Sequence, residues 1–103
     1  MEKFTVEYIF NKVSPAILWN CISTPDGLSS WFADNVDHVG KDFSFTWNNH
    51  TQQARLLKSV PDEMVRFRWE DEPADTYFEL AIHRLELTRD VALTVTDFAE
   101  DGD

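Results

Sequence analysis

The sequence has few cysteines, glycines and prolines: one, three and four among its 103 residues. A single cysteine, Cys21, cannot form an internal disulfide, so a disulfide framework is excluded. The few glycines form no glycine-rich phosphate loop, and no serine lies in a Gly-x-Ser-x-Gly motif. The sequence therefore supports neither nucleotide chemistry nor nucleophilic catalysis.

Basic residues and long apolar runs are also scarce. Nine Lys and Arg residues against nineteen Asp and Glu residues give a formal charge of −10, which would repel phosphate backbones and anionic lipid surfaces. We therefore expect no nucleic-acid partner. No apolar run approaches the roughly 18 residues that span a bilayer, and residues 1–12 lack the apolar core of a signal peptide. We expect a soluble, cytoplasmic protein with no membrane insertion.

Metal-ligand patterns are missing as well. The histidines, His38, His50 and His83, lie on separate segments, and none has a second ligand at a spacing typical of metal sites. The acidic run 70–75 lacks the Asp-x-Asp-x-Asp-Gly ladder of calcium loops and fits a solvated hairpin loop. We expect no metal and no other cofactor.

Apolar residues, in contrast, make up 43% of the chain and alternate with polar ones over much of its length. This pattern is typical of half-buried strands. The segments are 4–11, a hairpin over 36–47 that turns at Gly40, 52–60, 64–71, 76–87 and 91–100. Within 52–60, we place Ala54, Leu56 and Val60 on one face. The length allows a single domain, and the pattern predicts an antiparallel sheet of roughly seven strands.

Two short helices are expected after the first strand. Ser14 can accept hydrogen bonds from a helix start and Pro15 fits the first helical position, which predicts a helix over 15–22. Pro25 disfavours helical geometry at Thr24, so it ends this helix and begins a second one. Cys21 lies among apolar residues of the first helix and is expected to be buried.

The apolar face of the predicted sheet is larger than two short helices can cover. Each large apolar side chain contributes about 1.5–3 kcal/mol when fully buried, and a bare patch above a few hundred Å² is rare on a soluble monomer. Three covers are possible: the sheet curls and packs on itself, a second copy docks as a homodimer, or a helix follows Asp103.

Several stretches resemble the START-like superfamily. They are TPDGLSSWFADNV (24–36), FSFTW (43–47), VRFRWED (65–71) and residues 76–100, in the order strand, two helices, strands. The resemblance covers essentially the whole chain and is closest to small bacterial START-like proteins allied to activators of the heat-shock-protein-90 ATPase. It implies an α+β helix-grip fold with a curved antiparallel sheet. The family closes this sheet with a long C-terminal helix, which we expect to be absent here, so that the single domain 1–103 is truncated at its C-terminus.

The resemblance also implies a cavity between helices and sheet. Its candidate lining residues are Trp31, Phe32, Phe45, Trp47, Phe67, Trp69, Phe78, Leu80 and Asp97. For the aromatic residues, filling the core is the competing interpretation. Asp97 is the only carboxylate whose strand phase points inward, and a buried carboxylate must be paired or shifted in pKa. No catalytic residue is assigned.

Three functions fit these observations. The first is a non-enzymatic domain that binds a small hydrophobic or amphipathic ligand, an inference carried by fold analogy. The second is a protein-interaction module like the chaperone activators, whose acidic surface meets a chaperone or another basic protein. The third is an enzyme of the cyclase, hydratase or hydrolase kinds found on this fold, which needs polar groups that converge inside the cavity.

Overall fold

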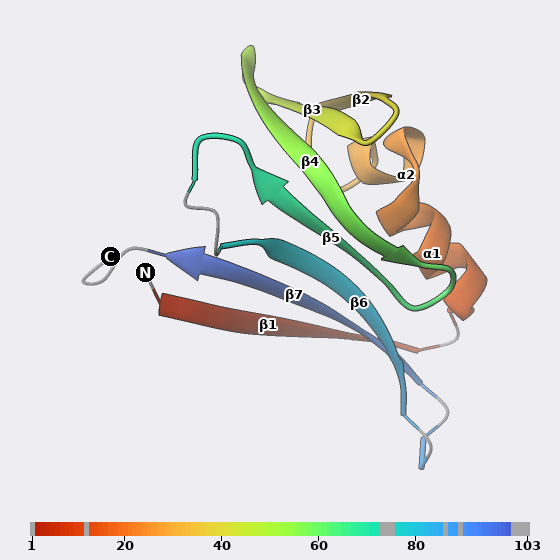
Figure 1. Ribbon diagram of the computed structural model, residues 1–103. Coiled ribbons are helices and arrows are strands. Elements are labelled where there is room, and N and C mark those ends of the chain that lie inside the picture. Colours follow the sequence, from red (N-terminus) through yellow and green to blue (C-terminus); the bar gives the residue numbers. More distant parts are fainter. Residues whose placement is uncertain (1, 12, 73–75, 86, 89, 100–103) are drawn as a thin grey trace.

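A computed structural model describes residues 2–11, 13–72, 76–85, 87–88 and 90–99 (Figure 1). The first strand is followed by two short helices and six further strands. The elements are β1 (Glu2–Phe10), α1 (Pro15–Ser23), α2 (Pro25–Ser29), β2 (Asn35–Val39), β3 (Asp42–Trp47), β4 (His50–Val60), β5 (Met64–Trp69), β6 (Phe78–Arg84) and β7 (Val91–Ala99). This arrangement confirms the predicted α+β class.

All seven strands form one curved antiparallel sheet in the order β1-β7-β6-β5-β4-β3-β2. Strands β2 to β7 follow one another as hairpins, and β1 adds to the far edge beside β7. The first strand therefore pairs with the last one, and the two lie side by side in Figure 1.

The two helices begin as the sequence predicts. The Ser14 hydroxyl accepts a hydrogen bond from the amide of Ile17 at 3.2 Å, and Pro15 occupies the first turn. Thr24 has an extended backbone between the helices, and its hydroxyl accepts from the amide of Gly27 at 2.9 Å. One threonine thus ends α1 and caps α2.

Aromatic side chains form the core between the helices and the inner face of the sheet. Phe45, Phe67 and Phe78 are less than 2% exposed, and the stacked rings of Phe67 and Phe78 lie 5.0 Å apart. From the other side, α1 contributes Leu18 and Ile22, and α2 contributes Leu28. The alternation seen in the sequence is therefore the division between the core face and the outer face.

One strand differs from the prediction. In β4 the pairing moves from Leu56 opposite Phe67 to Lys58 opposite Arg66, so Leu57 forms a β-bulge. An extra residue shifts the alternation, which puts Lys58 on the outer face and pairs Val60 with Met64 on that same face. Placing Val60 on the same face as Ala54 and Leu56 was therefore wrong.

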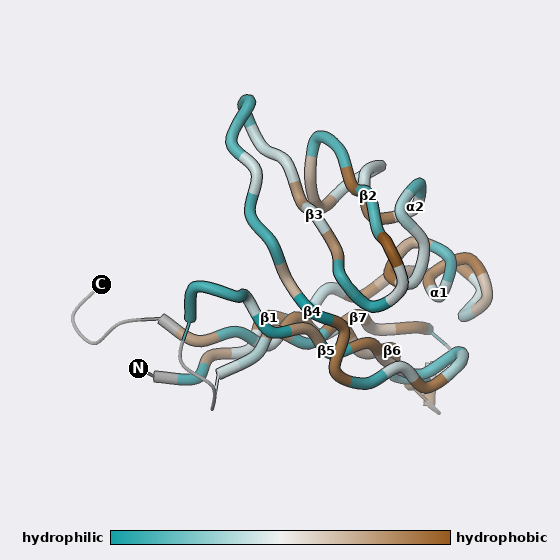
Figure 2. The backbone as a smooth tube through the Cα atoms, turned by 45° about the horizontal axis from the view of Figure 1, so that its top comes forward, coloured by the Kyte–Doolittle hydropathy of each residue, from teal (hydrophilic) through white to brown (hydrophobic). Residues whose placement is uncertain are grey.

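The helices cover only part of the inner face. They contact β2, β5 and β6, whereas the left-hand portions of β1 and β7 in Figure 1 extend beyond them. In Figure 2, apolar positions, coloured brown, continue along the sheet beyond the helices. On β1, Phe4, Val6 and Tyr8 share the inner face with Val95 and Leu93 of β7 and stay more than 40% exposed. An apolar strip of the inner face is therefore open.

Candidate functional site

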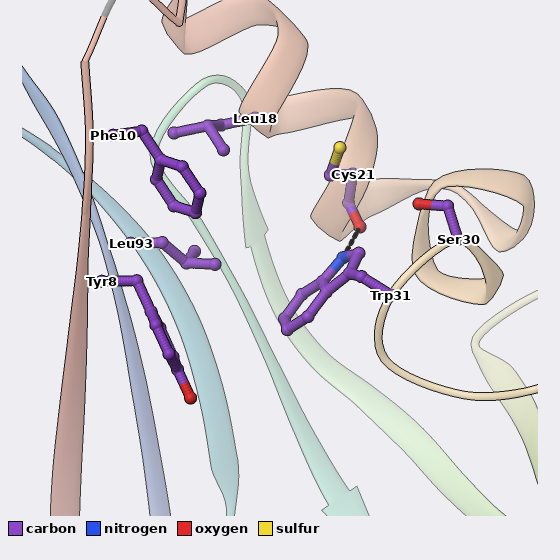
Figure 3. A pocket seen from close by; sticks show the side chains of 7 residues that line it. All are labelled: Tyr8, Phe10, Leu18, Cys21, Ser30, Trp31 and Leu93. Atoms are coloured by element: carbon purple, nitrogen blue, oxygen red, sulfur yellow. Dashed lines mark hydrogen bonds between the residues drawn. The ribbon is translucent and has the colours of Figure 1, made fainter.

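An apolar cleft of about 350 Å³ lies where this strip meets the helices (Figure 3). Its lining comes from β1, β7, α1 and the segment at the end of α2. The lining residues are Tyr8, Phe10, Leu18, Cys21, Ser30, Trp31 and Leu93. Carbon atoms form nearly all of this surface in Figure 3, so the cleft suits an apolar molecule.

Strand pairing and helix periodicity bring these side chains together. Tyr8 lies directly opposite Leu93 in the β1–β7 ladder, and Phe10 follows two residues later on the same face. Leu18 and Cys21 are three residues apart in α1, which places them on one side of the helix. The cleft is the space between that side of α1 and the sheet.

Trp31 forms the outer wall and is held in place by a backbone hydrogen bond. Its indole Nε1 donates to the carbonyl oxygen of Cys21 at 2.8 Å (Figure 3). This carbonyl is free because its usual helical donor would be residue 25, and Pro25 has no N–H. The Trp31 ring also packs edge-to-face on Phe32 at 5.4 Å, yet it stays 41% exposed. An aromatic surface is thus fixed at the mouth of the cleft.

A second hollow of about 450 Å³ lies on the other side of Trp31 and is more polar. Phe32 and Trp47, two further candidates from the sequence, line it together with Asp34. The Trp47 indole donates to the carbonyl of Phe32 at 2.8 Å, so this polar group is already used within the protein. The hollow is therefore a less suitable site for an apolar molecule.

The remaining aromatic candidates lie in the packed core. Phe45, Phe67, Trp69, Phe78 and Leu80 are at most 9% exposed and do not line the cleft. They pack on one another and beneath the helices. Of the nine candidate residues, Trp31 alone borders the cleft that the described residues form.

Sequence reasoning missed the other six lining residues. Tyr8, Phe10 and Leu93 fall on the apolar phase of the segments 4–11 and 91–100, which was the available signal. Leu18 and Cys21 belong to the predicted helix, but Cys21 is partly exposed at the cleft rather than buried. Ser30 carried no recognisable signal. The missing information was where the helical cover ends.

Asp97 lies farther along the open strip. It is opposite Phe4 in the β1–β7 ladder, on the face shared with Val95 and Leu93, and does not line the cleft. Partial burial raises the pKa of its carboxyl above the ordinary value, while a 2.8 Å hydrogen bond from the amide of Phe98 opposes this shift. Arg66 on the neighbouring part of the sheet forms an ion pair with Glu79 and not with Asp97.

Residues that could hold a metal ion are not gathered in the described part of the chain: no group of three or more His, Cys, Asp or Glu side chains occurs there. His83 is exposed, and its Nε2 lies 3.1 Å from the hydroxyl of Thr94. Part of the acidic run 70–75 lies outside the described residues. None of the described helices is long and apolar enough to cross a membrane.

Comparison with known proteins decides the family. A family model described as the START-like superfamily domain matches residues 1–103. The chain belongs to the START-like superfamily. This confirms the resemblance seen in the sequence. A comparison with curated proteins found no match.

Solved structures share the START-like fold. BfR322 from Bacteroides fragilis is 40% identical, with a TM-score of 0.73 over 97% of this chain and 75% of that chain. The Aha1 dimer from Colwellia psychrerythraea is 20% identical, with a TM-score of 0.80 over 100% of this chain and 81% of that one. XoxI from Bacillus cereus is 13% identical, with a TM-score of 0.79 over 95% and 75%. At 20% and 13% identity, the Aha1 and XoxI structures show similarity of the fold alone.

Proposed function

We propose that this START-like domain is a cytoplasmic, non-enzymatic module that binds a small hydrophobic or amphipathic molecule in the cleft beside Trp31. The observation that carries the proposal is the apolar lining of a 350 Å³ cleft that is open at one side. Ligand pockets in proteins measure about 300–1,000 Å³ and are lined mainly by apolar and aromatic side chains. The volume and the lining both fall within that description.

The few polar groups at the cleft favour an amphipathic ligand. Tyr8 and Ser30 carry hydroxyl groups, and Figure 3 shows the Tyr8 hydroxyl at one end and Ser30 at the other. The Trp31 indole N–H is already bonded to Cys21. A ligand with an apolar body and one polar group would bury the body against Tyr8, Phe10 and Leu93 and leave the polar group at the opening.

The described lining contains no carboxylate and no histidine, and Asp97 lies outside it. General acid–base catalysis most often uses such a group within hydrogen-bond reach of the substrate, and Tyr8 and Cys21 are the only residues of the described lining that could serve in its place. The geometry therefore favours binding over the enzymatic alternative.

A titration with Nile red, a neutral apolar dye, tests the proposal. Trp31→Ala removes one wall of the cleft, and the loss of roughly 1.4 kcal/mol of apolar contact corresponds to about tenfold weaker binding. The control is Val39→Ala, which truncates an exposed apolar side chain on β2, outside the cleft, and should leave the affinity unchanged. Equal affinities of folded Trp31→Ala and wild type would refute binding in this cleft.

A protein-interaction role like that of the chaperone activators is a second proposal, supported by the net charge of −10 and by the fold shared with the Aha1 dimer. It predicts salt-sensitive binding to a chaperone or another basic protein in a pull-down. Homodimerisation through the open strip of Phe4, Val6 and Tyr8 belongs to the same proposal. Sedimentation of wild type against Val6→Asp tests it, since a buried charge would dissociate such a dimer.

A further inference from the structure

Positive charge gathers on the outer face of the sheet, although the chain as a whole is strongly acidic. Four of the nine basic residues, Arg55, Lys58, Arg66 and Arg68, lie on the adjacent strands β4 and β5. They form two cross-strand pairs, with Arg55 opposite Arg68 and Lys58 opposite Arg66. We call these four residues the basic stripe.

The bulge at Leu57 creates the second pair. Lys58 is three residues after Arg55, so regular alternation would turn its side chain toward the inner face. The extra residue restores Lys58 to the outer face, opposite Arg66, and Leu57 is 44% exposed. The local distortion of β4 therefore places a fourth cation beside the other three.

Like charges that face each other across a ladder destabilise a sheet unless something neutralises them. Two members of the stripe have partners: Arg55 lies 3.2 Å from Asp42, and Arg66 lies 2.6 Å from Glu79. Arg66 also lies over the ring of Tyr77 at 4.4 Å, which fixes its orientation. Lys58 and Arg68 form no ion pair with any residue of the described part of the chain.

The stripe also faces away from the core. Its side chains alternate with the buried residues Val65, Phe67 and Trp69, whose face both helices cover. Lys58 and Arg68, which lie diagonally across the β4–β5 ladder, thus remain uncompensated on an open surface in a protein that has nineteen acidic residues available to neutralise them. A stable fold does not require this arrangement, so an external partner is the better explanation.

We propose that the basic stripe on β4 and β5 docks an extended acidic segment of a partner protein. Neighbouring strands are about 4.8 Å apart, and alternate residues of one strand are separated by roughly 6.7 Å. Carboxylates at every second position of an extended segment therefore match the spacing along the stripe. Both internal partners of the stripe, Asp42 and Glu79, are carboxylates, which shows that this face accommodates such groups.

The overall charge favours a protein over a nucleic acid. The charge of −10 repels a polyanion over long distances, whereas the stripe acts within a Debye length of about 8 Å at physiological salt. A duplex carries one charge per roughly 1.7 Å of its axis and would present far more negative charge than two free cations can neutralise. A short acidic peptide segment would not present more negative charge than the stripe can neutralise.

Fluorescence anisotropy with a fluorescein-labelled peptide of alternating glutamate and serine, at 100 mM salt, tests the proposal. Lys58→Gln and Arg68→Gln should each weaken binding about two- to fivefold, the range of an exposed ion pair. The matched control is Arg84→Gln, which removes the same charge from the end of β6 and should bind like wild type. The peptide with lysine in place of glutamate should not bind.

A second measurement separates docking from a structural role. Because removal of Arg68 relieves repulsion with Arg55, Arg68→Gln should raise the melting temperature while it weakens peptide binding. The proposal is overturned if the glutamate peptide does not bind, or if Arg68→Gln and Arg84→Gln bind it equally. Tighter binding of single-stranded DNA, or of phosphatidylserine vesicles, than of the peptide would also overturn it.

Discussion

The contact between the two helices gives the sharpest test of the fold, because Gly27 of α2 touches the backbone of α1. A Cβ atom at Gly27 would lie 2.0 Å from the carbonyl oxygen of Asn20 and 2.8 Å from the Cα of Cys21. Both are backbone atoms, so no side-chain rotation can relieve the overlap. Gly27→Ala must therefore push the helices apart.

Two opposing terms set the size of the effect. Alanine favours a helix over glycine by about 1 kcal/mol, which by itself would stabilise the variant. Overpacking costs roughly 1–3 kcal/mol, and a clash between backbones belongs at the upper end of that range. We expect Gly27→Ala to lower the free energy of unfolding by about 2 kcal/mol. The shift should also disturb Trp31, whose indole is bonded to Cys21.

Urea unfolding followed by far-ultraviolet circular dichroism measures this loss. Gly40→Ala is the control: its Cβ would meet no atom within 4 Å, and the only cost is its positive φ of 60°. That cost is about 1 kcal/mol. If Gly27→Ala were as stable as wild type, or more stable, the helices would not pack as described and the reasoning would fail.

Two further predictions concern Asp97 and Thr24. Because burial raises the pKa of Asp97 in the folded state, ionisation destabilises the fold as the pH rises through that pKa, so Asp97→Asn should raise stability at pH 7. The gain in stability should vanish below pH 3.8, where Asp97 is protonated in both the folded and the unfolded state. Thermal unfolding measured over a series of pH values checks the sign of this effect. Thr24→Ala removes the cap on Gly27 and should cost about 1 kcal/mol in urea unfolding, whereas Thr24→Ser should retain most of the stability.

Local sequence rules predicted most of the fold, because they depend only on neighbouring residues. The prolines at 15 and 25, each preceded by a hydroxyl side chain, defined both helix starts. Alternation in β5 separated Val65, Phe67 and Trp69 from the outward arginines without ambiguity. Such patterns fix which face of a strand is buried, and the family resemblance supplied the order in which the strands assemble.

The bulge and the cleft could not be predicted, because both depend on distant partners. The residues around Leu57 give no sign that Leu57 has no paired residue in β5. Val60 was therefore placed on the wrong face. Similarly, Phe67 and Tyr8 occupy equivalent strand phases, yet the helices cover Phe67 and leave Tyr8 half exposed. The extent of helical cover is a property of packing, and it decides which aromatic residue fills the core and which one borders the cleft.

Pro25 connects the local rules to the site. It separates the two helices, and because it lacks an N–H it also leaves the Cys21 carbonyl without a helical donor. The indole of Trp31 satisfies this carbonyl with a hydrogen bond of 2.8 Å. The residue that ends α1 therefore also determines where the aromatic wall stands, so the position of the cleft follows from the way the first helix is terminated.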